Sequence, residues 1–163
     1  MHQTLIALGA NIADPAAALP LAWRIVVAEL GLQRTRLSAV ISSLPAEAAT
    51  GPSFANAVGL GYTSAEPEDV LAQLHRIEAA FGRDREQEGH HGCRPLDLDL
   101  LAMGALRREG PTLTLPHPRI AHRDFVLAPL LELTPAWIEP RSGRPAALLL
   151  ARLADDAPTK EMT

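Results

Sequence analysis

The stretch Arg94-Pro95-Leu96-Asp97-Leu98-Asp99-Leu100-Leu101 decides the fold of this 163-residue chain and points to its chemistry. Leucine and aspartate alternate with the period of two that is typical of a β-strand with one buried face. The leucines are predicted to enter the core together, and Asp97 and Asp99 to share the opposite face. Their Cα atoms would lie about 6.6–7 Å apart. Two carboxylates at that spacing can bind divalent cations roughly 3.5–4 Å apart, the two-metal arrangement used on phosphate groups.

An Asp-x-Asp strand is also common as a solvated sheet face, and for the motif alone that alternative stays open. Two neighbouring features favour the metal interpretation. Arg94 places a guanidinium, a bidentate donor to phosphate oxygens, beside the pair. Two like charges on one strand face also repel each other, and a bound Mg²⁺ removes that penalty.

Length and composition predict one globular domain over residues 1–163, with 155–163 as a frayed tail. Hydrophobic residues make up 47% of the chain and charged residues 21%, which is ordinary for a soluble protein. No apolar run approaches the roughly 20 residues that cross a membrane, and the N-terminal sequence shows no secretory pattern. The single cysteine, Cys93, fits a reducing compartment. We therefore expect a cytoplasmic protein, and we expect it to be a monomer.

Charge is distributed unevenly along the chain. The net charge of −4 argues against a general binder of nucleic acid or of anionic membranes. The chain has fourteen arginines and one lysine, and seven of the arginines fall in one segment: 83, 85, 94, 107, 108, 119 and 123. Genomic base composition can explain the excess of arginine over lysine, but it does not explain the clustering. A local arginine cluster in an acidic protein favours a small polyphosphate ligand.

Periodicity and capping signals predict the order β-α-β-β-α-β. Strands are expected at 4–8, 36–43, 56–63 and 94–101, and helices at 15–30 and 67–81, followed by an extended segment at 113–116 and helices at 125–133 and 145–153. Asp14-Pro15 starts the first helix and Gly31 ends it, while Pro20 either kinks it or delays its start. The segments 44–53 and 83–93 are expected to be loops.

This order is the α+β pattern of a ferredoxin-like βαββαβ sandwich, an antiparallel sheet with helices on one face, here with additional C-terminal helices. The other face of the sheet is left to loops and later segments. We expect Asp97 and Asp99 to point toward that open face.

Other motifs narrow the chemistry. The chain contains no Gly-x-x-x-x-Gly-Lys-Ser/Thr loop, which argues against a P-loop kinase. His90, His91 and Cys93 invite a zinc interpretation, but no second ligand pair of comparable spacing exists, so a loop with incidental imidazoles is favoured. The segment 116–125 holds two histidines, two arginines and an aromatic residue, and it could present His117 and Arg123 to an anionic ligand.

Several of these motifs together resemble the 6-hydroxymethyl-7,8-dihydropterin pyrophosphokinase family of folate synthesis. They are Arg83-x-Arg85, residues 92–101, Leu115-Pro116-His117-Pro118-Arg119 and residues 123–130. Leu8-Gly9-Ala10-Asn11 and Phe54-Ala55-Asn56-Ala57 match earlier family motifs in the same order. The resemblance covers residues 4–140.

The resemblance implies a ferredoxin-like enzyme that transfers pyrophosphate from ATP to the hydroxymethyl group of the pterin, with two Mg²⁺ ions, and releases AMP. By position it implies magnesium ligands at Asp97 and Asp99. It implies catalytic or polyphosphate contacts at Arg83, Arg94 and Arg123, nucleotide-side contacts at Glu78, Arg85 and His117, and pterin contacts at Phe54, Asn56 and Phe125. No partner is implied beyond these small molecules.

The chain departs from the family in two loops, at 45–52 and at 91–94. These departures keep open a catalytically weak paralogue that binds pterin or nucleotide. A nucleotidyltransferase could use the same Asp-x-Asp strand, but its usual Gly-Ser motif before the acidic strand is missing.

Overall fold

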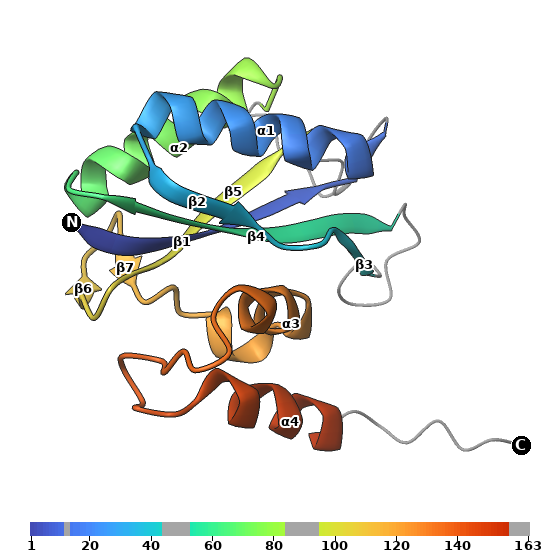
Figure 1. Ribbon diagram of the computed structural model, residues 1–163, viewed down its shortest axis with the longest axis vertical. Coiled ribbons are helices and arrows are strands. Elements are labelled where there is room, and N and C mark those ends of the chain that lie inside the picture. The colour runs from blue at the N-terminus through green and yellow to red at the C-terminus, as the bar shows by residue number, and fades with distance from the viewer. Residues whose placement is uncertain (12–13, 44–52, 84–94, 157–163) are drawn as a thin grey trace, which may run out of the picture.

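A computed structural model describes residues 1–11, 14–43, 53–83 and 95–156 (Figure 1). Several sequence predictions fall elsewhere and so lie outside the described residues: the loops at 44–53 and 83–93 almost entirely, the tail beyond 156, the zinc alternative at 90–93, and the assignments of Arg85 and Arg94.

The centre of the fold is a five-stranded antiparallel sheet in the order β2-β4-β1-β5, with β3 also paired to β4. The strands are β1 (His2–Ala10), β2 (Gln33–Leu37), β3 (Ile41–Ser43), β4 (Phe54–Thr63) and β5 (Asp97–Met103). A second, two-stranded sheet pairs β6 (Arg108–Glu109) with β7 (Thr114–Leu115).

Helices cover both faces of the main sheet (Figure 1). α1 (Pro15–Leu30) and α2 (Pro67–Ala80) lie on one face, and α3 (Asp124–Leu133) lies against the other, with α4 (Ala146–Asp156) packed outside it. A short 3₁₀ turn (Ile120–His122) precedes α3. The ferredoxin-like α+β prediction is therefore confirmed, with the C-terminal helices on the second face.

The predicted bounds of α1 are confirmed, and its ends show why. The Asp14 carboxylate accepts a hydrogen bond from the Ala17 amide at 3.2 Å, and Gly31 closes the helix in the left-handed region at φ 57°. Pro20 does not delay the start, because the helix begins at Pro15 and contains Pro20 on its exposed side.

The prediction of one continuous strand over 36–43 is wrong, because residues 38–40 leave the ladder and separate β2 from β3. The Ser38 hydroxyl accepts a hydrogen bond from the Val58 amide and donates one to the Ala39 carbonyl, each at 2.9 Å. The Ala39 amide donates to the Glu132 carboxylate of α3, at 2.9 Å to Oε2. Residues far along the chain thus satisfy the backbone groups that a continuous strand would have used.

The Asp-x-Asp strand forms as the alternation predicts, although it starts at Asp97 and runs on to Met103. Leu96, Leu98 and Leu100 are at most 2% exposed and join the core beneath α1 and α2. Asp97 and Asp99 are half-buried on the opposite face. One face of β5 therefore packs in the core, and the other face carries the two carboxylates.

The sheet has a hydrophobic core on each side. One core packs Trp23 of α1 and Leu74 of α2 against the sheet, and the other packs Leu127 of α3, Trp137 and Leu149 of α4. Among the described residues, no helix combines the length and the apolar character that a membrane span requires.

Candidate active site

The floor of the site is a row of residues across three adjacent strands of the sheet. Gly9 of β1 is paired with Asn56 of β4 on one side and with Asp97 of β5 on the other. A Cβ atom at Gly9 would lie 3.6 Å from Asn56 Oδ1 and 3.8 Å from Asp97 Cβ. Because glycine leaves this strip free of side-chain atoms, a ligand can approach the sheet between Asn56 and Asp97.

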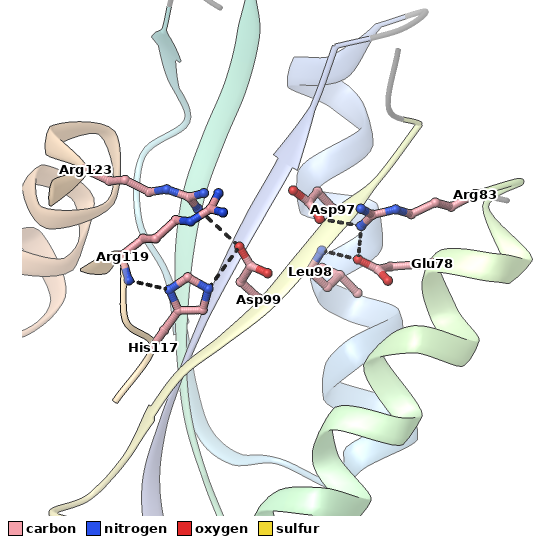
Figure 2. Close-up of polar contacts among 8 residues, drawn as sticks. All are labelled: Glu78, Arg83, Asp97, Leu98, Asp99, His117, Arg119 and Arg123. Carbon is pink, nitrogen blue, oxygen red and sulfur yellow. Dashed lines mark hydrogen bonds and ion pairs between the residues drawn. The ribbon is translucent and has the colours of Figure 1, made fainter. Parts of the chain in front are cut away.

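Glu78 of α2 anchors one side of the site (Figure 2). Its carboxylate is 1% exposed, and Oε1 accepts hydrogen bonds from the Leu98 amide at 2.7 Å and from Arg83 Nη1 at 2.5 Å. Arg83 also pairs with Asp97, and its side chain is only 6% exposed. Glu78 and Arg83 therefore tie the end of α2 to β5 and hold the Asp97 side chain.

Asp99 lies at the other side of the site, among groups from the segment before α3 (Figure 2). Its Oδ2 accepts a hydrogen bond from Arg123 Nη1 at 3.3 Å. His117 Nε2 points toward the same oxygen at 4.0 Å, too far for a hydrogen bond. The His117 amide donates to the Leu101 carbonyl of β5 at 2.8 Å, which places the imidazole beside the strand.

The tautomer of His117 follows from its second ring nitrogen. Nδ1 accepts a hydrogen bond from the Arg119 amide at 3.1 Å, so in the neutral ring the proton is on Nε2. Burial lowers the pKa of His117 below 6.5, and the nearby Arg123 and Arg119 lower it further, although the charges of Asp99 and Asp97 oppose this. The neutral imidazole thus directs an N–H donor into the site.

The predicted pterin contacts come from two elements that face each other. Phe54 and Asn56 are two residues apart on β4, so they share the sheet face of Asp97 and Asp99. The Asn56 amide nitrogen donates to the Ser43 hydroxyl at 2.8 Å, which directs Oδ1 toward Gly9. Phe125 lies in the first turn of α3, with the Arg123 guanidinium 5.7 Å from its ring centroid. A ring held between Phe54 and Phe125 stays a prediction.

A cavity of about 300 Å³ adjoins the Asp99 carboxylate. It lies between α2, β5 and the β6–β7 hairpin, and its wall includes Asp99 and His117. The remaining lining residues are Leu71, His75, Leu100, Gly110, Pro111, Thr112, Leu113, Thr114 and Pro118.

The arginine cluster predicted from the sequence is only partly gathered at the site. Arg83 and Arg123 contact the two aspartates. Arg107 instead donates to the Pro140 carbonyl, and Arg108 lies 3.6 Å from the Glu68 carboxylate. The interpretation of the whole cluster as a polyphosphate grip is therefore corrected for these two residues, whose contacts lie away from the two aspartates.

Sequence reasoning missed the cavity wall and the Ser43–Asn56 contact. Leu71, His75 and Glu78 recur at i, i+4 and i+7, and this stripe on α2 was a signal that all three face one direction. No local signal reveals that the 110–114 turn, or Ser43, would lie beside residues from other elements.

The donor set fits a hard divalent cation. Asp97 and Asp99 offer carboxylate oxygens on one strand face, beside a floor that Gly9 keeps open. Mg²⁺ is commonly bound by one or two carboxylates together with substrate phosphates. A cation held there would share the two carboxylates with Arg83 and Arg123.

A ferredoxin-like sandwich with paired carboxylates between arginines, next to a small-molecule cavity, defines an enzyme of the phosphate-transferring class. Residues 5–135 match the family described as 7,8-dihydro-6-hydroxymethylpterin-pyrophosphokinase (HPPK). Because this match spans most of the chain, the chain belongs to that family.

Relatives named 2-amino-4-hydroxy-6-hydroxymethyldihydropteridine pyrophosphokinase are similar over most of their length. The one from Synechocystis sp. is 34% identical over 152 residues, covering 93% of this chain and 76% of the relative. The one from Pseudomonas aeruginosa is 37% identical over 154 residues, covering 93% and 91%.

Longer proteins contain a similar region. A mitochondrial folate synthesis bifunctional protein from Arabidopsis thaliana is 38% identical over 81% of this chain, which spans 23% of that protein. The crystal structure of Plasmodium falciparum HPPK-DHPS with pteroate shares the fold, with a TM-score of 0.70 at 13% identity. It matches 94% of this chain, which spans 42% of the solved chain.

Proposed function

We propose that this chain transfers the pyrophosphoryl group of ATP to the hydroxymethyl group of 6-hydroxymethyl-7,8-dihydropterin, giving AMP and the pterin diphosphate in folate biosynthesis. The observation that carries the proposal is the placement of Asp97 and Asp99 on one strand face, between Arg83 and Arg123 and beside the cavity. Family membership supports the same reaction.

The proposed reaction needs positioning and charge neutralisation more than covalent help from the protein. The hydroxymethyl oxygen forms a bond to the β-phosphorus of ATP and gives up its proton to solvent water. The bond between that phosphorus and the oxygen bridging it to the α-phosphorus breaks, and AMP leaves with the bridging oxygen. Negative charge shifts toward AMP, so fixed donors around the phosphates lower the barrier.

Asp97 and Asp99 are the residues that would hold magnesium, as two ions. Bound Mg²⁺ would neutralise phosphate charge and orient the phosphates for in-line attack. Arg83 and Glu78 contribute by fixing the position of the Asp97 side chain at the start of β5. Glu78 is buried, so we assign its effect on the nucleotide to this anchoring.

We place the nucleoside of ATP in the 300 Å³ cavity, because the cavity opens onto Asp99 and His117. From there the triphosphate would lie along the aspartates. His117 would donate from Nε2 to a phosphate oxygen, and Arg123 would supply positive charge. Arg85 and Arg94 are proposed as further phosphate contacts on the family resemblance alone.

The acceptor would lie over the floor on the other side of Asp97. Asn56 Oδ1, directed toward Gly9, can accept a hydrogen bond from a ring N–H or amino group. Phe54 and Phe125 would stack on the two faces of the pterin ring, a geometry that aromatic rings favour. This arrangement would bring the hydroxymethyl group next to the metal-binding carboxylates.

We further propose a monomeric, cytoplasmic enzyme that acts on these small molecules and not on nucleic acid or membranes. The single cysteine and the net charge of −4 support this. Size-exclusion chromatography with light scattering tests the monomer, and a dimer mass would contradict it.

The proposed function is tested by measuring AMP release from ATP and Mg²⁺ with and without the hydroxymethyl-dihydropterin. We expect AMP only when the acceptor is present, and none when a chelator removes the metal. Tight binding of both ligands without acceptor-dependent AMP would favour the weak-paralogue alternative.

A further inference from the structure

The β6–β7 hairpin forms one wall of the cavity but has little structure of its own. Its two strands have two residues each, paired Arg108 with Leu115 and Glu109 with Thr114. The turn between them, from Gly110 to Leu113, lines the cavity, and one hydrogen bond of 3.1 Å joins its ends. A hairpin this short is marginal alone, so contacts from elsewhere must fix the wall.

Two of the contacts that fix the hairpin come from the 138–145 turn, the segment Ile138–Pro145 between α3 and α4. Arg107, just before β6, donates from Nη2 to the Pro140 carbonyl. Arg141 of the turn lies 3.9 Å from the Glu109 carboxylate of β6. A contact from Arg108 to Glu68 comes from α2. Leu113 and Leu115 of the hairpin are also buried in the core beneath α1 and α2.

The 138–145 turn is itself well ordered by internal hydrogen bonds. The buried Glu139 carboxylate accepts from the Ser142 amide at 2.6 Å and the Arg141 amide at 2.9 Å. The Glu139 backbone bonds to Arg144 and Gly143, each at 2.8 Å. Burial raises the pKa of Glu139, but hydrogen bonds from Ser142 and Arg141 outweigh it and hold the pKa below its usual value. The turn therefore presents the Pro140 carbonyl in a fixed position.

We propose that the 138–145 turn braces the β6–β7 hairpin as a wall of the cavity, and that Arg107 is a positioning residue for ATP. This inference rests on the proposed function, in which the cavity holds the nucleoside. The turn lies in the C-terminal segment, beyond residue 135, where the match to the family model ends. Arg107 acts through the hairpin, which it holds in the conformation that lines the cavity.

Two variants and one matched control test the brace. Arg107→Ala removes the contact to Pro140, Arg107→Lys keeps a donor, and Arg144→Ala removes an exposed charge from the same turn without touching the hairpin contacts. We expect Arg107→Ala to raise the KM for ATP roughly threefold to tenfold, the equivalent of one hydrogen bond. The kcat and the KM for the acceptor should stay within about twofold. Arg107→Lys should recover part of the loss, and Arg144→Ala should behave as wild type.

Hydrogen exchange tests the brace independently of the enzyme activity. Amides of residues 108–115 should exchange faster in Arg107→Ala than in the wild type or in Arg144→Ala, with or without ATP. Unchanged exchange, an unchanged KM for ATP, or parallel increases in both KM values would overturn the brace. A wild-type protein that binds no ATP would contradict the proposed function instead, whatever the exchange shows.

Discussion

At the residue scale, Asp97 and Asp99 have different surroundings although they share one strand face. Asp97 is held by Arg83, which is itself buried against Glu78. Asp99 is 31% exposed and faces Arg123, His117 and the cavity. Asp97 is therefore more rigidly fixed, and Asp99 is the carboxylate closer to the proposed nucleotide.

Replacing either aspartate by asparagine should remove turnover and preserve the fold. The amide keeps the shape of the side chain but cannot neutralise a divalent cation. We expect kcat to fall at least about a hundredfold for each variant, comparable to losing a major electrostatic contact in a transition state. Steady-state kinetics at several Mg²⁺ concentrations and circular dichroism measure the two effects. An active, folded Asp97→Asn/Asp99→Asn double variant would contradict the metal assignment.

His117 should make the stability of the protein sensitive to acid. Its pKa is lowered in the folded state, mainly by burial, so below pH 6.5 the unfolded chain binds more protons than the folded one. This contribution to stability is therefore full above pH 6.5 and is lost progressively as the pH falls toward the folded-state pKa. Urea midpoints at several pH values check the sign. His117→Gln, which cannot titrate, should lose less stability on acidification; an equal loss would show that other groups are responsible.

Sequence reasoning succeeded for residues whose neighbours in the chain define their direction. The face shared by Asp97 and Asp99 follows from the period of a strand. The pairing of Glu78 with the Leu98 amide does not, because it depends on how α2 packs against β5. Arg107 shows the opposite failure: its charge suggested phosphate, and its partner is a carbonyl from a segment 33 residues away.

At the element scale, α3 is attached to the sheet at both ends. Arg123 bonds Asp99 of β5 just before the helix starts, and Glu132 near its end accepts the Ala39 amide between β2 and β3. The Glu132 carbonyl also accepts from Arg36 of β2 at 3.3 Å. Since Phe125 is on α3, these contacts set its position relative to Asn56 and Phe54.

Removing the second attachment should weaken acceptor binding selectively. We expect Glu132→Ala to raise the KM for the pterin roughly fivefold, the effect of about 1 kcal/mol, because Ala39 loses its acceptor. The KM for ATP should not change. Glu132→Gln keeps an acceptor oxygen and should behave almost as wild type. Glu66→Ala is the matched control, because it removes an exposed carboxylate that makes no capping bond. Equal effects of Glu132→Ala on both substrates would show a general loss of structure.

The same contacts explain why β2 and β3 could not be predicted as separate strands. The sequence 36–43 alternates well enough for one strand, and nothing within it calls for a break. The break is stabilised by Val58 and Glu132, so it is a tertiary feature. By contrast, the ends of α1 were predictable because Asp14 and Gly31 are local signals.

At the scale of the whole molecule, one sheet separates two cores and belongs to both. Trp23 lies in the core under α1 and α2, and Trp137 in the core under α3 and α4, each at most 7% exposed. Every central strand contributes side chains to both cores, so neither helical layer can lose its packing without exposing the sheet. The chain should therefore unfold in one cooperative transition.

The two tryptophans, the only ones in the chain, can report on the two layers separately. In Trp23→Phe the fluorescence follows the α3 and α4 layer, and in Trp137→Phe it follows the α1 and α2 layer. We expect the fluorescence and circular dichroism transitions in urea to coincide within each variant. Separate midpoints in either variant would mean that one layer unfolds first.

The order of elements, and with it the ferredoxin-like fold, was predictable because it depends on local periodicity and turns. The layer formed by α3 and α4 was only partly so, because the sequence indicates two helices and leaves the second face to later segments, but it does not show how these helices pack there. The same distinction between predictable and unpredictable parts applies to the site. Its carboxylates come from a predictable strand, whereas its walls come from the packing of α2, α3 and the β6–β7 hairpin.

The central claim is that the β-phosphorus of ATP moves to the acceptor together with the γ-phosphorus. It is tested most directly with ATP carrying a radioactive label at the β-phosphorus, followed by chromatographic separation of the pterin product from the nucleotides. The account predicts that the label appears in the pterin product in amounts equal to the unlabelled AMP formed. Label retained in the nucleotide as ADP, with a singly phosphorylated pterin, would contradict it.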